Sequence, residues 1–150
     1  MDYYKYMRQA LTLAALAGAR GEVPVGALLV WQDKVVAANA NATEITADCL
    51  AHAEMIVLQK AQRTLNRRWL EDTTLFVTME PCPMCAGAIV LCRVGQVVFG
   101  CPDSRWGACG SVFNVPENRQ SNFRPRVVGG ILEDECRAVL QDFFRSLRKN

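Results

Sequence analysis

The chain has 150 residues, of which 51% are hydrophobic and 21% charged, and its formal net charge is +2. A chain of this length buries about 68–70% of its unfolded surface, so it can build one core without disulfides. No apolar run approaches the roughly 20 residues that cross a bilayer, which argues against a membrane protein. We expect residues 1–150 to form a single domain.

The cysteines indicate the cellular compartment, and the arginines indicate the kind of partner that the protein could bind. The seven cysteines are an odd number scattered along the chain, a pattern typical of a reducing compartment, so we expect a cytoplasmic protein. Arginines cluster at 63–68, 119–126 and 137–148. Each cluster alone is more simply explained as a solvated face, but together they are compatible with a nucleic-acid partner.

The first half of the chain predicts a helix, a hairpin and a second helix. Before GEVPVG (21–26), apolar residues recur at helical spacing, so we expect an amphipathic helix. A signal peptide is disfavoured there because alanine, not leucine, dominates the run. The segments 27–31 and 35–40 flank the turn QDK and predict a β-hairpin. Residues 49–63 predict the second helix, with Asp48 as its N-cap.

Strands and helices then alternate to the end of the chain. We expect strands at 74–79, 96–100 and 127–132, helices at 84–94 and 133–149, and a loop-rich stretch at 101–126. This alternation implies an α/β fold whose sheet is covered by helices on both faces. In such sheets, functional sites gather where strands pass into helix N-termini.

Metal-binding residue types lie at two such helix starts. His52, the only histidine, stands in the sequence HAE, and Cys82 and Cys85 stand in PCPMC. Zinc binds imidazole nitrogen and thiolate sulfur in a tetrahedral shell, and three protein ligands leave a fourth position for water. Glu54 would then work as a general acid and base beside the metal without binding it. The pair H-x-E and P-C-x-x-C is the signature of zinc-dependent nucleobase deaminases.

On the residues alone, two other interpretations stay open. A C-x-x-C pair is commonly redox-active. Cys49 lies three residues before His52 and on a helix would share its face, so it could close a Cys3His structural shell and leave Glu54 without a role.

The catalytic interpretation also has a geometric condition. Residues two apart point about 200° away from each other on an ideal helix, so His52 and Glu54 converge only near its first turn.

The motifs of the chain resemble those of the bacterial tRNA-specific adenosine deaminases. The similarity extends over nearly the whole chain and is carried by LAHAEM (50–55), TMEPCPMCAGA (78–88), VVFG (97–100), ILEDEC (131–136) and DFFR (142–145). It implies a cytidine deaminase-like three-layer α/β/α sandwich around a five-stranded mixed sheet. It also implies a homodimer with one Zn²⁺ per subunit. The implied reaction is hydrolysis of the wobble adenosine of a tRNA anticodon to inosine.

The resemblance also implies roles for individual residues. It assigns zinc binding to His52, Cys82 and Cys85, and proton shuttling to Glu54. Further residues would contact RNA: the Ala53 backbone and Asn41 at the target nucleotide, Asp103 at the adjacent backbone or sugar, and, for stacking or phosphate contact, Arg105, Trp106, Phe123, Phe144 and Arg145.

Two loop positions depart from the family pattern. Phe123 stands where a histidine is common, and Pro102 stands where an arginine could meet a phosphate. These departures affect RNA affinity and substrate identity rather than the chemistry. A deaminase of a free base or nucleoside, of guanine or cytosine type, therefore stays an alternative. A non-catalytic zinc and RNA-binding module is a further one.

Overall fold

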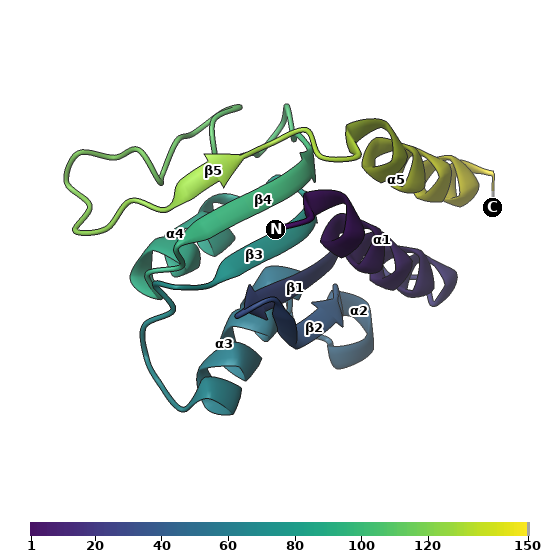
Figure 1. Cartoon of the computed structure of the whole chain (residues 1–150). Coiled ribbons are helices and arrows are strands. Elements are labelled where there is room, and N and C mark those ends of the chain that lie inside the picture. The colour runs from purple at the N-terminus through teal and green to yellow at the C-terminus, as the bar shows by residue number, and fades with distance from the viewer. Residues whose placement is uncertain (150) are drawn as a thin grey trace.

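A computed structural model describes residues 1–149 as ten helices and strands (Figure 1). They are α1 (Tyr3–Ala19), β1 (Gly26–Trp31), β2 (Lys34–Ala40), α2 (Thr43–Thr46), α3 (Ala53–Leu65), β3 (Thr74–Met79), α4 (Pro83–Leu91), β4 (Gln96–Cys101), β5 (Arg126–Val128) and α5 (Glu133–Arg148). Within the described residues, none of these helices is both long and apolar enough to span a membrane.

The five strands form one mixed sheet in the order β2-β1-β3-β4-β5. β1 pairs antiparallel with both β2 and β3, whereas β3, β4 and β5 run parallel to one another. Alternate residues of a strand point to opposite faces of the sheet, so each central strand contributes side chains to two hydrophobic cores. In β3, for example, Leu75 and Val77 enter one core and Phe76 enters the other.

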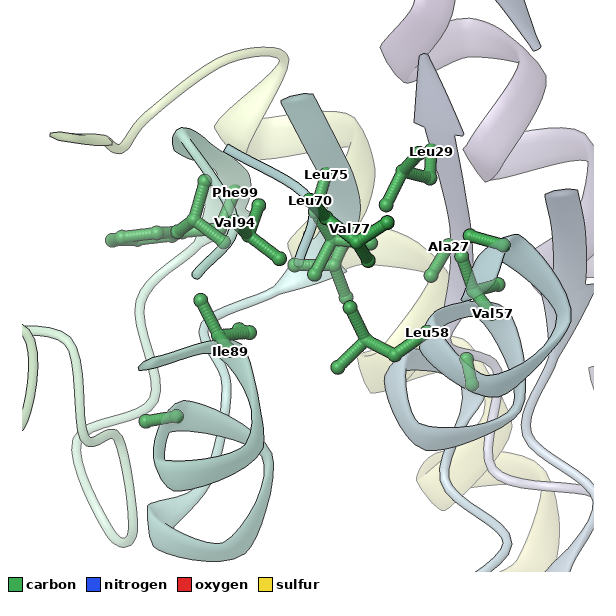
Figure 2. Close-up of a cluster of buried hydrophobic side chains, with 14 of the residues drawn as sticks. Ala27, Leu29, Val57, Leu58, Leu70, Leu75, Val77, Ile89, Val94 and Phe99 are labelled. Carbon is green, nitrogen blue, oxygen red and sulfur yellow. The ribbon is translucent and has the colours of Figure 1, made fainter. Parts of the chain in front are cut away.

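Helices cover both faces of the sheet and make three layers. α1 and α5 pack on one face, where Tyr6 and Met7 of α1 surround Phe76 together with Leu140 of α5. α3 and α4 cover the other face, where the buried side chains of Val57, Leu58 and Ile89 meet the sheet (Figure 2). The predicted α/β/α sandwich with a five-stranded mixed sheet is therefore confirmed.

Several predicted boundaries were wrong, most importantly at the second long helix. α3 begins at Ala53 rather than at residue 49, and Asp48 is not its N-cap. The Asp48 carboxylate instead accepts the N–H of Leu50 at 2.9 Å, which closes a turn. The preceding segment forms the short helix α2, which was not predicted, and it ends because Ala47 adopts a left-handed conformation (φ 50°).

The last strand is also shorter than predicted. β5 ends at Val128 instead of continuing to residue 132. Gly129 lies against the ring of Phe99 so closely that a Cβ would overlap it, and Gly130 has φ +88°. The double glycine therefore turns the chain out of the sheet and into α5.

The close packing of β1 against α1 at Gly26 can be tested by substitution. A Cβ on Gly26 would overlap the Ala10 carbonyl oxygen, so Gly26→Ala must push strand and helix apart. We expect the free energy of unfolding to fall by about 2–3 kcal/mol in urea denaturation. Leu16→Ala, on the exposed side of α1, is the control and should change it by less than about 0.5 kcal/mol. An unchanged midpoint for Gly26→Ala would contradict this packing.

Candidate active site

Three side chains of metal-binding types converge where α3 and α4 begin. His52 is the N-cap of α3, Cys82 is the N-cap of α4, and Cys85 lies in the first turn of α4. The His52 Nδ1 atom is 3.6 Å from the sulfur of Cys82 and 3.5 Å from that of Cys85. All three ligand atoms lie within 4.8 Å of one another. The group can hold a metal ion.

Cys49 does not belong to this group. Of the described residues, only His52, Cys82 and Cys85 form a cluster that could hold a metal ion, and the Cys49 thiol is exposed. The reason is the late start of α3: Cys49 lies in the turn before the helix, so it does not share a helical face with His52. The closed Cys3His shell is therefore not formed, and three ligands leave one tetrahedral position open.

Glu54 satisfies the geometric condition because His52 is not helical. The backbone of His52 is extended (φ −70°, ψ 149°), whereas Glu54 lies in the first turn of α3. The 200° separation of helical residues two apart therefore does not apply. The Glu54 side chain is 4% exposed and lines the same cavity as His52 and Cys82. Burial raises its pKa from 4.5 to about 7, against the opposing effect of the nearby imidazole.

The pKa values of the two thiols are shifted in opposite directions. A hydrogen bond from Cys85 lowers the pKa of Cys82 to about 4, and His52 contributes in the same direction. The same hydrogen bond, together with burial, raises the pKa of Cys85. Cys82 at the start of α4 is therefore held as a thiolate, the form that binds metal.

The cavity beside the ligands has a volume of about 280 Å³. Asn41, which directly follows β2, and Asp103 and Trp106, which follow β4, line it together with His52 and Cys82. Ala53 is fully buried as the first residue of α3, where an α-helix leaves its N–H without an intrahelical acceptor. The structure thus brings the predicted nucleotide-contacting residues to the metal-binding group.

A larger groove of about 1110 Å³ adjoins this cavity, and both are lined by Met79 and Asp103. Its walls are the loop after β4, including Arg105, and the outer part of α5, including Phe144 and Arg145. Of the predicted RNA-contacting residues, Arg105, Phe144 and Arg145 line this groove, Trp106 lines the adjoining smaller cavity, and Phe123 is the exception. The ring of Phe123 is half-buried in the long loop and lines neither cavity.

Two buried carboxylates were missed by the sequence analysis. Glu22 is fully buried and accepts the N–H groups of Glu44 and Ile45 at 3.1 and 2.7 Å, which anchors the segment after Asn41. Glu80 is 3% exposed and accepts hydrogen bonds from the loop after β4. The available signal was their place in GEVPVG and MEPC, where a single charge interrupts an apolar run.

Comparisons with known proteins agree with this geometry. A family model described as MafB19-like deaminase matches residues 1–148. The tRNA-specific adenosine deaminase of Bacillus subtilis (strain 168) is 46% identical over 144 residues, which cover 96% of this chain and 89% of the relative. The chain belongs to this deaminase family. The resemblance to bacterial tRNA-specific adenosine deaminases is therefore confirmed.

Other members of the deaminase family and their structures extend the comparison. The tRNA-specific adenosine deaminase of Aquifex aeolicus (strain VF5) is 39% identical, over 97% of this chain and 95% of the relative. One solved structure comes from work on A-to-I editing by tRNA:A34 deaminases at the wobble position. It matches with a TM-score of 0.88 at 37% identity, and the match covers 91% of this chain and 99% of the other. A guanine deaminase from Nitrosomonas europaea shares the fold, with a TM-score of 0.76 at 23% identity over 93% of this chain and 83% of its own.

The cluster predicts which substitutions affect metal binding. His52→Ala leaves two ligands, and we expect the apparent zinc affinity to fall on the order of a hundredfold or more, measured by chelator competition. Cys49→Ser is the matched control and should bind zinc as the parent chain does, because the Cys49 thiol lies outside the cluster. Equal metal affinity in His52→Ala would remove His52 from the site.

The raised pKa of Glu54 predicts a pH dependence of stability in the metal-free chain. A carboxyl whose folded pKa is about 7 instead of 4.5 keeps its proton on folding, and this stabilisation is lost as the pH rises through 7. We expect the stability of the parent chain relative to Glu54→Gln to fall by on the order of 2 kcal/mol between about pH 5 and 7.5. Urea denaturation with a chelator measures this difference, and a pH-independent value would contradict the raised pKa.

Proposed function

We propose that the chain hydrolyses adenosine to inosine at the wobble position of a tRNA anticodon. The observation that carries the proposal is a buried acid, Glu54, placed beside an open three-ligand cluster in a chain with tRNA-specific adenosine deaminase relatives. A chloroplastic relative from Arabidopsis thaliana is named for adenine 34 of the tRNA, and the matching structure comes from work on the wobble position.

Zinc is the metal that the donor set fits best. One imidazole nitrogen and two thiol sulfurs form the Cys2His set found in catalytic zinc sites with an open position. His52 would bind through Nδ1, the nitrogen that faces both sulfurs. A bound zinc ion supplies Lewis acidity that makes water ionisable near neutral pH.

Glu54 would move the protons of the reaction. It takes one proton from the attacking water and gives it to N1 of the purine while the water oxygen bonds to C6. It then takes the second proton of that water and gives it to the amino group, so that the C6–N bond breaks and ammonia leaves. A general acid and base works best with a pKa near the working pH, which suits the pKa of about 7 of the buried Glu54.

An unpaired anticodon base can enter the cavity at low cost, since unstacking such a base costs only a few kcal/mol. Asn41, the Ala53 backbone and Asp103 would hold the target nucleotide. The groove along α5 would receive the flanking nucleotides, with stacking on Trp106 and phosphate contacts from arginines. Arg105, Arg145 and Phe144, all of which line the groove, are the residues that we expect to make these contacts.

A homodimer with one zinc ion per subunit belongs to the same proposal. α4 has no charged residue, yet only Cys85, Ala86 and Ile89 of its side chains are buried, and Leu91 at its end is 79% exposed. A helix that is apolar on all sides is usually buried, so a second copy of the chain is expected to cover its outer face. A cytoplasmic location is part of the same proposal and is supported by the odd number of scattered cysteines.

The direct test uses an anticodon stem-loop with adenosine at the wobble position and the zinc-loaded chain. We expect inosine at that position by mass spectrometry of the digested RNA, and none in a stem-loop whose adenosines are all base-paired. Absence of inosine with one zinc ion per chain would contradict the proposal. Ammonia released from guanine or cytosine, with none from RNA, would identify a small-molecule deaminase instead.

Glu54→Ala separates catalysis from binding. Because Glu54 lies outside the ligand cluster, this variant should keep its zinc and its RNA affinity. Its rate of inosine formation should fall by about 10² to 10⁴ because the proton shuttle is gone. A variant with normal zinc content and unchanged rate would show that another group moves the protons.

A further inference from the structure

Glu80 is a buried acid that the proposed reaction does not use. It directly follows β3 and precedes the ligand segment by two residues, and its side chain is 3% exposed. Its backbone N–H donates to the carbonyl of Cys101 at 2.9 Å, so the pairing of β3 with β4 continues through it. Glu80 therefore stands between the metal-ligand residues and the loop after β4.

The carboxylate of Glu80 is surrounded by donors from that loop. Oε1 accepts the N–H of Asp103 at 3.1 Å and also the hydroxyl of Ser111. Oε2 accepts the N–H groups of Cys109 and Ser111 at 3.0 and 3.1 Å. Four donors thus occupy both oxygens, and Glu80 is not in the metal-binding cluster of the described residues.

The loop folds tightly over this carboxylate. A Cβ on Gly107 would lie 2.6 Å from Oε1, so only glycine permits the approach. The Gly107 N–H donates to the Asp103 carbonyl at 3.0 Å. Asp103 itself accepts the N–H groups of Arg105 and Trp106 at 3.0 and 3.3 Å. Asp103, Arg105 and Trp106, which line the cavity or the groove, therefore belong to one hydrogen-bonded unit around Glu80.

The same unit carries an exposed aromatic pair. The Trp106 ring is 55% exposed and contacts the Phe113 ring edge to face, with centroids 5.2 Å apart. The N–H of Phe113 donates to the Gly107 carbonyl at 3.0 Å. The position of Trp106 beside the cavity thus depends on the turn that Glu80 holds.

We propose that Glu80 is a positioning residue that fixes the 103–113 loop relative to the metal ligands and thereby determines how tightly RNA binds. The inference rests on the proposed function only for its substrate. Glu80 acts through Asp103, Arg105 and Trp106, not on the reacting atoms, because its oxygens are already occupied by the loop.

Glu80→Gln tests the proposal because a glutamine amide has one oxygen acceptor, whereas both oxygens of the Glu80 carboxylate accept hydrogen bonds. An N–H of Asp103 faces one carboxylate oxygen, and the N–H groups of Cys109 and Ser111 face the other. Whichever way the glutamine amide is oriented, its NH₂ group meets at least one backbone donor. That donor loses its hydrogen bond in a buried place, which is more costly than losing an exposed contact.

The first readout follows the loop and does not need activity. In a zinc-loaded Trp31→Phe/Trp69→Phe background, Trp106 is the remaining tryptophan, and acrylamide quenching reports its exposure. We expect Glu80→Gln to raise the quenching constant by about twofold. Glu117→Gln, which removes an equal charge from an exposed position of the same long loop, is the control and should leave it unchanged. Unchanged quenching in Glu80→Gln would overturn the proposal.

The second readout separates binding from chemistry. We expect KM for the anticodon stem-loop to rise about tenfold in Glu80→Gln while kcat changes less than threefold and zinc stays at one per chain. Loss of zinc, or a loss confined to kcat, would place Glu80 in the metal site or the chemistry and overturn the proposal. Where Glu80→Gln does not fold, Ser111→Ala removes one of the four contacts and must shift quenching and KM in the same direction.

The outcomes distinguish this inference from the proposed function. A parent chain that makes no inosine would refute the function. The quenching comparison would still decide whether Glu80 holds the loop.

Discussion

The site depends on two helix N-termini that meet beside the carboxyl end of the central strand, β3. α3 precedes β3 and α4 follows it, so both helices begin beside the carboxyl end of this strand. Each contributes a ligand at its N-cap, His52 and Cys82, in an extended backbone conformation. Extended N-caps let the ligands face one another, and the first turn of α3 then places Glu54 against the same cavity. The core packing of α3 and α4 on the sheet is what fixes this arrangement.

The short helix α2 and the loop after β4 complete the site, and each is held by a buried carboxylate. Glu22 binds the backbone of the segment after Asn41, and Glu80 binds the backbone of the loop that carries Asp103. Backbone N–H groups satisfy both acids, so neither needs a positively charged partner. The two carboxylates thus give these segments the fixed geometry that substrate positioning requires.

The fold and the convergence of the three candidate metal ligands could be predicted from the sequence for a physical reason. Alternating strands and helices have distinct periodicities, and His52, Cys82 and Cys85 are chemically distinctive residues. Prediction failed where tertiary contacts decide the outcome. The start of α3 was placed four residues early because Asp48 has the chemistry of an N-cap, yet it closes a turn instead. The role of Glu80 could not be predicted, since all of its side-chain partners lie more than twenty residues away in sequence.

The proposed function requires a metal centre with three protein ligands and one open position. X-ray absorption at the zinc edge of the loaded chain measures the atoms around the metal. We expect two sulfur neighbours at about 2.3 Å and two nitrogen or oxygen neighbours at about 2.0–2.1 Å, one of them exchangeable water. A third sulfur in the shell would contradict this expectation, because the site would then be closed and Glu54 would have no water to act on.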